Sequence, residues 1–264
     1  MEPLAPVVAL ALLYTAVLAQ HGRRAAAPLT PLRIAAGFGG LAALALVLGP
    51  PLDGWATSDL AAHMLQHVVL LAVAPPLLLL GCVPAAVVCA LPRGSRRSVE
   101  VAARRVARSV RAAPPFYRAA GAIALQTVVI GVWHLPRLYD AAAAGNALHA
   151  LEHASFLAAG CVFWWCVTEL GSESGAAWAV VCLFLASLPA TLLGALMTLS
   201  TAPWYPYYTA GTGAHALTRQ QLAGVVMWGV GGMVYVVSAA ALFATWLARM
   251  EESAPARARM EPAR

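Results

Sequence analysis

The chain has 264 residues, of which 61% are hydrophobic and 11% charged, whereas an average soluble domain is roughly 45 to 50% apolar and about 25% charged. This composition excludes a soluble globular fold. A membrane-spanning helix needs about 20 mostly apolar residues, so seven spans would use roughly 140 residues and exclude a large soluble domain. The net charge is +6 and all 17 basic residues are arginine, so the charge has to be interpreted by its position relative to the membrane.

Seven apolar runs follow one another along the chain, each bounded by glycine, proline or charged residues. They cover residues 4–20, 32–50, 60–91, 117–135, 147–170, 176–200 and 220–248. We therefore predict an all-α membrane protein, with a seven-transmembrane helix bundle in residues 1–250 and a tail in residues 251–264. No basic residue precedes the first run, whereas Arg23 and Arg24 follow it. This order favours a retained span over a cleaved signal peptide.

The arginines predict the orientation of this bundle. The connection at residues 92–118 holds eight arginines against one acid, Glu100, so the positive-inside rule places it in the cytoplasm. The N-terminus is then outside and the C-terminus cytoplasmic. Three arginines before or at the start of the second run and four in the last segment also fall inside, which leaves only Arg137 and Arg219 outside.

Within this basic connection, four arginines share one face of a helix: Arg97, Arg104, Arg108 and Arg111. Valines and alanines lie largely opposite, which is typical of a helix in the membrane interface. Because anionic lipid explains the charge, we expect membrane lipid as a partner and no nucleic acid.

Six of the seven histidines fall at the outer face in this topology. They are His63, His67, His134, His149, His153 and His215. The third, fifth and seventh runs enter from outside and the fourth ends there, so histidines far apart in sequence can converge. A single histidine at a helix end is usually an interfacial hydrogen-bonding residue, but six polar groups near one membrane face favour a metal or cofactor site.

The histidine spacing suits a metal. His63 and His67, like His149 and His153, are four residues apart, so each pair projects from one helical face. Imidazole suits copper, zinc, iron and nickel, whereas a thioether favours reduced copper.

Other polar and sulfur side chains complete the predicted site. Met64 and Met227 are the best-placed thioethers, and carboxylates of Asp59, Asp140 and Glu152 are candidates to orient the imidazoles. The five cysteines lie in apolar stretches without a C-x-x-C pair, so we expect them to pack rather than to bind metal. Pro75 and Pro76 should kink the third run.

Four strings together resemble the CtaG-type cytochrome c oxidase assembly family. They are HMLQHVVLLAVAPPLLLLG (residues 63–81), WHLPRLYDAA (133–142), LHALEHASFLAAGCVFWW (148–165) and QQLAGVVMWGVGG (220–232). The resemblance covers roughly residues 55–245 and implies a seven-span protein of the bacterial plasma membrane that helps to form an active haem-copper oxidase by delivering copper. Arg219 departs from this pattern, in which an acidic residue is expected before the glutamine pair.

The resemblance and the residues together predict an assembly factor that is not an enzyme and binds copper at an outward-facing His/Met site. The predicted ligands are His63, His67, His134, His149, His153, Met64 and Met227. The predicted supporting residues are Asp59, Asp140, Glu152 and Gln221. Cytochrome c oxidase subunits and a soluble copper donor are the expected partners.

Two other functions compete with this one. A haem-binding electron carrier with axial histidines is the leading alternative. A solute transporter is weaker because the sequence shows no inverted repeat.

Overall fold

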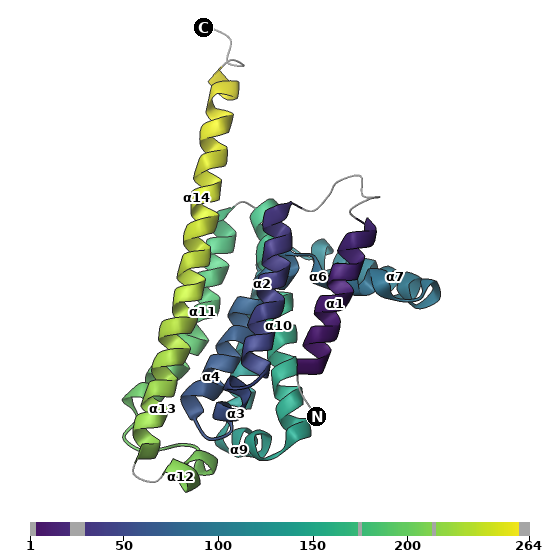
Figure 1. The fold of residues 1–264 in the computed structure, drawn as a ribbon. Coiled ribbons are helices and arrows are strands. Elements are labelled where there is room, and N and C mark those ends of the chain that lie inside the picture. Colours follow the sequence, from purple (N-terminus) through teal and green to yellow (C-terminus); the bar gives the residue numbers. More distant parts are fainter. Residues whose placement is uncertain (1–3, 22–29, 174–175, 213–214, 259–264) are drawn as a thin grey trace.

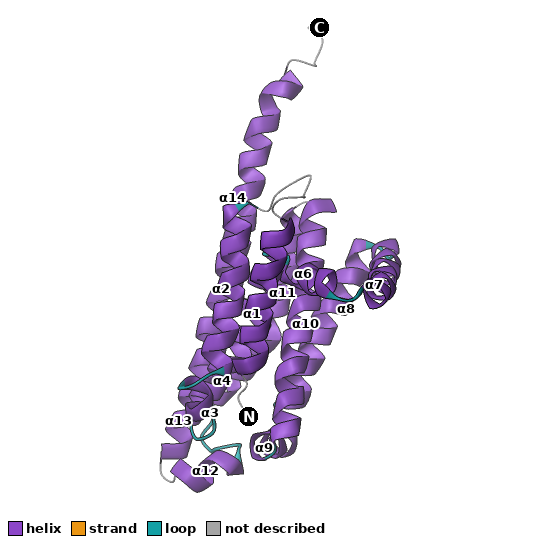
Figure 2. Cartoon of the chain, turned by 45° about the vertical axis from the view of Figure 1, so that its right-hand side comes forward, coloured by secondary structure: helices purple, strands orange, loops and turns teal. Residues whose placement is uncertain are grey.

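The computed structural model describes residues 4–21, 30–173, 176–212 and 215–258, and the secondary structure in these ranges is entirely helical (Figure 2). Six helical stretches in this part of the chain are long and apolar enough to cross a membrane. They are Pro31–Leu48, Leu60–Leu80, Pro115–Trp133, Asn146–Gly171, Ala177–Leu199 and Ala216–Ala248. Leu4–Gln20 is a shorter apolar helix. The prediction of an all-α membrane protein is thus confirmed.

The helices follow one another in the order expected from the apolar runs (Figure 1). The first half of the chain contains α1 (Leu4–His21), α2 (Pro31–Leu48), α3 (Leu52–Ala56), α4 (Leu60–Val68), the π-helix η1 (Val69–Val73), α5 (Ala74–Leu80), α6 (Val83–Ala90) and α7 (Arg93–Ala112). The second half contains α8 (Pro115–Trp133), α9 (Pro136–Ala144), α10 (Asn146–Glu173), α11 (Ala176–Leu199), α12 (Pro206–Thr212), α13 (Ala216–Val225), the π-helix η3 (Val226–Val230) and α14 (Gly231–Ala258).

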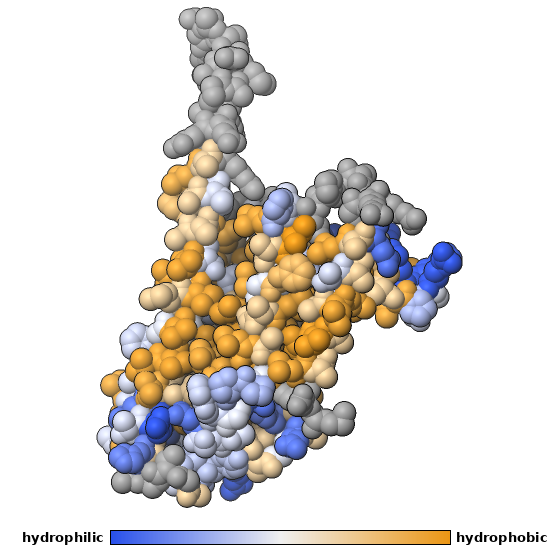
Figure 3. Space-filling view, viewed as in Figure 1, coloured by the Kyte–Doolittle hydropathy of each residue, from blue (hydrophilic) through white to orange (hydrophobic). Residues whose placement is uncertain are grey.

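The two ends of the bundle differ in chemistry. Helix α7 projects sideways near one end, whereas the short helices α3, α9 and α12 gather at the other (Figure 1). Hydrophobic residues cover the middle of the molecule, and hydrophilic residues gather at α7 and at the α9 and α12 end (Figure 3). Apolar side chains in α11, such as Phe184 and Leu192, are exposed, as expected of a surface that faces lipid.

One predicted boundary differs from the structure. The third run is not one helix over residues 60–91, because it ends at Leu80 and a separate helix, α6, follows. Cys82 adopts a left-handed conformation with φ 55°, and a Cβ at Gly81 would lie 2.2 Å from the Cα of Gly37. The chain therefore turns where it passes closely against α2. The tail predicted to start at residue 251 is helical to Ala258, and residues 259–264, like Arg23 and Arg24, lie outside the described residues. The helix predicted within the connection 92–118 is α7, which covers most of that segment.

The third span contains a π-helical turn directly before its two prolines. Pro75 and Pro76 occupy the first turn of α5, directly after η1. Because proline has no N–H, the carbonyl of Leu71 lacks its helical donor, and the indole Nε1–H of Trp164 in α10 donates to it at 3.2 Å. A Cβ at Gly160 would lie 2.6 Å from the same carbonyl oxygen, so glycine lets α10 approach. This contact fixes α10 against the span that carries His63 and His67.

Candidate metal centre

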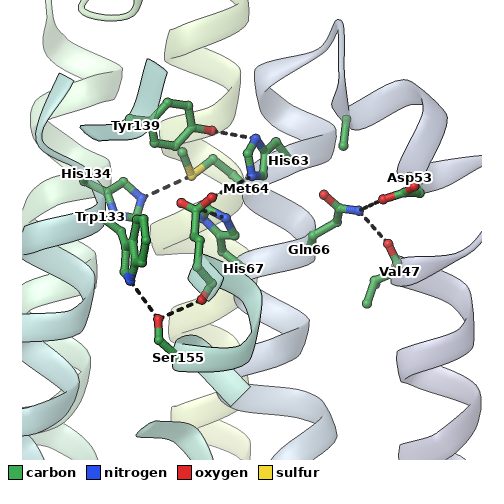
Figure 4. Close-up of polar contacts among 12 residues, drawn as sticks. Val47, Asp53, His63, Met64, Gln66, His67, Trp133, His134, Tyr139 and Ser155 are labelled. Atoms are coloured by element: carbon green, nitrogen blue, oxygen red, sulfur yellow. Dashed lines mark hydrogen bonds and ion pairs between the residues drawn. The ribbon is translucent and has the colours of Figure 1, made fainter. Parts of the chain in front are cut away.

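Three helices bring the predicted histidines together at the α9 and α12 end of the bundle. Helix α4 carries His63 and His67, α10 carries His149 and His153, and His134 follows the last residue of α8. All are buried except His149, which is half-buried. Figure 4 shows the α4 histidines on the side of α4 that faces His134 and Tyr139.

The opposite side of α4 is anchored to α2 and α3. The side-chain amide of Gln66 is fully buried and donates to the Val47 carbonyl at 2.6 Å and to Asp53 Oδ1 at 3.2 Å (Figure 4). On the α10 side, Trp133 Nε1 donates to Ser155 Oγ at 2.7 Å, and this hydroxyl donates to the Glu152 carbonyl at 2.8 Å. Both helices are therefore held by hydrogen bonds next to their polar side chains.

Four buried side chains form a compact donor group, which we name the His3Glu group: His63, His67, His153 and Glu152. One ligand atom from each residue lies within 4.8 Å of the others. The Glu152 carboxyl oxygens lie 3.7 Å from His63 Nε2 and 3.5 Å from His67 Nε2. Glu152, predicted as a supporting residue, thus belongs to the donor group itself and is fully buried.

Most of the donor atoms in this group have no hydrogen-bond partner among the described residues. They are His63 Nε2, both ring nitrogens of His67, both carboxyl oxygens of Glu152 and His153 Nε2. Buried polar atoms are almost always paired, and leaving one unpaired costs about 1 to 3 kcal/mol. A cation among these atoms would satisfy several lone pairs at once, so the residues present fit a metal ion.

Two tyrosines lie against Nδ1 of His63, and Tyr208 fixes the tautomer of this histidine. Tyr208 Oη lies 2.8 Å from the Ala56 carbonyl oxygen and 2.7 Å from His63 Nδ1. Because a carbonyl can only accept, the single phenol proton goes to Ala56, and His63 Nδ1 must donate. Burial raises the pKa of both Tyr139 and Tyr208, so both phenols stay protonated at neutral pH. The second phenol, Tyr139 Oη, lies 3.0 Å from the same nitrogen.

The consequence is that His63 carries its proton on Nδ1 and its lone pair on Nε2. Nε2 faces the carboxyl of Glu152, and neither atom has a proton to share if the carboxyl is ionised. An acceptor facing an acceptor in a buried site is unfavourable without a cation. The hydrogen-bond pattern around His63 therefore presents a metal ligand in its binding form.

The remaining histidines and the predicted thioethers border the His3Glu group. His149 packs on His153 and His63, with ring centroids 4.1 and 5.0 Å apart. His134 Nε2 lies 3.4 Å from Met64 Sδ. Met227, in η3, is buried beside a cavity of about 20 Å³ that His67 and His134 also line.

The other predicted supporting residues make their polar contacts elsewhere. Asp59 accepts from the backbone at the start of α4 and pairs with Arg219, so the arginine found in place of an acid links α13 to α4. Asp140 accepts from the Tyr207 N–H at 3.2 Å, and Gln221 donates to the Ser200 carbonyl at 3.2 Å. His215 is exposed. These three supporting residues position helices and connections rather than imidazoles.

Three residues at the centre were not singled out from the sequence: Tyr139, Tyr208 and Phe156. Phe156 packs on His67 with ring centroids 4.4 Å apart. The tyrosines come from α9 and α12, the short helices between spans. In the sequence, only their position in outer connections next to the histidines indicates a role for these tyrosines. Residue spacing does not tell which phenol contacts which imidazole.

Comparison with known proteins identifies the family of this chain. A family profile described as cytochrome c oxidase caa3 assembly factor matches residues 12–249, which include every helix that contributes to the His3Glu group. No curated protein and no solved structure matches the chain. The matched segment spans most of the sequence, and the chain therefore belongs to the cytochrome c oxidase caa3 assembly factor family.

Proposed function

We propose that this assembly factor binds copper at the His3Glu group and passes it to cytochrome c oxidase during maturation of the enzyme. The observation that carries the proposal is a set of four buried donors within 4.8 Å of one another, most of whose ligand atoms lack hydrogen bonds. Imidazole is a good ligand for copper. Copper is also the metal that we expect an assembly factor of a copper enzyme to supply. The chemistry is binding and transfer, so the protein has no catalytic residues.

The crowding of the imidazoles favours a metal ion over haem. The ring of His63 lies 4.4 Å from that of His67 and 5.8 Å from that of His153 by centroid distance. Histidines that bind the two faces of one haem must be separated by the macrocycle, whereas these rings contact one another directly.

Metal analysis of the purified protein tests the proposal. Wild-type protein should contain copper, and His63→Ala/His67→Ala should lose most of it because half of the donors are removed. His215→Ala is the matched control, since this histidine is exposed and outside the group. A strong Soret band in the wild-type spectrum, or equal copper in the double variant, would contradict the proposal.

We also propose that the His3Glu group lies on the outer side of a bacterial plasma membrane. The group lies beside α9 and α12, whereas the arginine-rich helix α7 lies toward the other end of the bundle (Figure 1), and the positive-inside rule assigns α7 to the cytoplasm. The group would then lie near the outer leaflet, where a soluble copper donor could reach it from outside.

Reporter fusions test this orientation. Alkaline phosphatase should be active when fused after Thr57 and inactive when fused after Arg105, because the enzyme needs an oxidising compartment for its disulfides. The reverse pattern would move the histidines to the cytoplasmic side.

A further inference from the structure

We propose that the site contains a second, softer subsite, in which His134, Met64 and Met227 bind Cu(I) next to the His3Glu group. This inference rests on the proposed copper-binding function and deepens it. The two subsites differ in donor chemistry, because one supplies imidazole and carboxylate and the other supplies imidazole and thioether.

The proton count at His134 provides the first argument. His134 Nδ1 lies 2.8 Å from the Ile130 carbonyl oxygen, so this nitrogen must carry the proton that is donated. A second proton would place a cation in a buried site without a carboxylate contact among the described residues, which is costly. The lone pair is therefore on Nε2.

This lone pair faces the thioether of Met64, with 3.4 Å between Nε2 and Sδ. A thioether sulfur has no proton to donate, so neither atom can hydrogen-bond to the other. Both side chains are buried, Met64 completely. An imidazole nitrogen and a sulfur that face each other without a proton between them are placed to bind one cation together.

The cavity beside this pair provides the second argument. It measures about 20 Å³ and is lined by His134, His67, Met227 and Tyr235 among apolar residues. A space of this size holds roughly one water-sized particle. Met227 therefore borders the same space as His134, whereas Met64 contacts His134 Nε2 directly, and none of the residues that line the cavity is a carboxylate.

The donor atoms of the softer subsite select for copper in its reduced state, Cu(I). Thioether ligands favour Cu(I), whereas carboxylate oxygen favours harder ions. Zinc should therefore bind in the His3Glu group and not in the softer subsite. His67 connects the two, because its ring lies 5.6 Å from that of His153 and 5.7 Å from that of His134. A copper ion could thus pass between the subsites without leaving the buried site.

X-ray absorption of the full chain loaded with Cu(I) without oxygen tests this inference. Wild-type protein should show sulfur scatterers around copper and should bind more Cu(I) than Zn(II). Met64→Leu and Met227→Leu should each weaken this extra Cu(I) binding by about tenfold or more, since even changes outside the ligand sphere cost about 10 to 100-fold. Zn(II) binding should stay at the wild-type level, which also shows that the variants fold.

Met197→Leu is the matched control, because Met197 is fully buried and does not line the cavity. Copper with only nitrogen and oxygen neighbours, in an amount that neither Met64→Leu nor Met227→Leu changes, would overturn the second subsite and leave the proposed function standing. Wild-type protein that binds no copper at all would overturn both.

Discussion

In cells whose own copy carries His63→Ala and His67→Ala, cytochrome c oxidase should lose most of its activity and copper, although the assembly factor still inserts. The two imidazoles are half of the His3Glu group, and His153 and Glu152 alone would hold copper far more weakly. Insertion depends on the apolar spans and the arginine distribution, which do not change. The measurement is oxidase activity and the ratio of copper to haem in isolated membranes, normalised to the amount of assembly factor. His149→Ala/His153→Ala should act in the same direction.

Cys161→Ala provides the control within the same bundle, because Cys161 is half-buried on α10 and is assigned to packing. Excess copper in the medium should partly restore oxidase activity in the histidine variants, since weakened capture is relieved by mass action. Normal oxidase in stably expressed histidine variants, together with a loss in the cysteine variant, would make the histidine cluster structural.

Removing both phenols next to His63 should weaken copper binding by about 10 to 100-fold, the usual effect of losing a partner that orients a metal-binding histidine. In Tyr139→Phe/Tyr208→Phe, His63 Nδ1 loses both oxygens within hydrogen-bond distance. The imidazole is then free to rotate or to carry its proton on Nε2, which blocks the ligand atom. Competition titration with a copper chelator measures the affinity.

Tyr208→Phe alone should also weaken copper binding, because Tyr139 Oη, 3.0 Å from the nitrogen, can then donate its proton to Nδ1 and leave the histidine proton on Nε2. Tyr207→Phe is the control, since Tyr207 adjoins Tyr208 in α12 and its backbone N–H contacts Asp140. An affinity in the double variant equal to that of the control would mean that the phenols do not orient His63.

Helical periodicity and membrane topology explain what the sequence could predict. The interval of four residues put His63 and His67 on one face, and the alternation of spans put them at the same end as His149 and His153. The structure places these four rings in contact. The four-residue interval and the alternation of spans do not depend on how helices pack against one another, so both can be read from the sequence alone.

The details that depend on packing between distant elements could not be predicted. Glu152 lies inside the donor group because Gly160 lets α10 approach the π-helix of the third span, and Tyr208 reaches His63 from a connection 145 residues away. Asp59 was expected beside an imidazole, but the free N–H groups at the start of α4 and the guanidinium of Arg219 compete for its oxygens. Which acceptor a side chain finds depends on such partners.

The π-helix η1 determines the direction in which the α4 histidines point. A π turn contains about one residue more than an α turn, so Val69–Val73 acts as a one-residue insertion between His67 and the prolines. Helix α5 is fixed by the contact of Pro75 with Gly160 and of Gly81 with Gly37. If all five residues adopted α-helical pitch, His63 and His67 would rotate by about 100° around the helix axis relative to α5, whereas deleting one residue would turn the π turn into an α turn and keep their direction. The π-helical pitch of η1, more than the identity of its residues, thus directs these imidazoles at their partners.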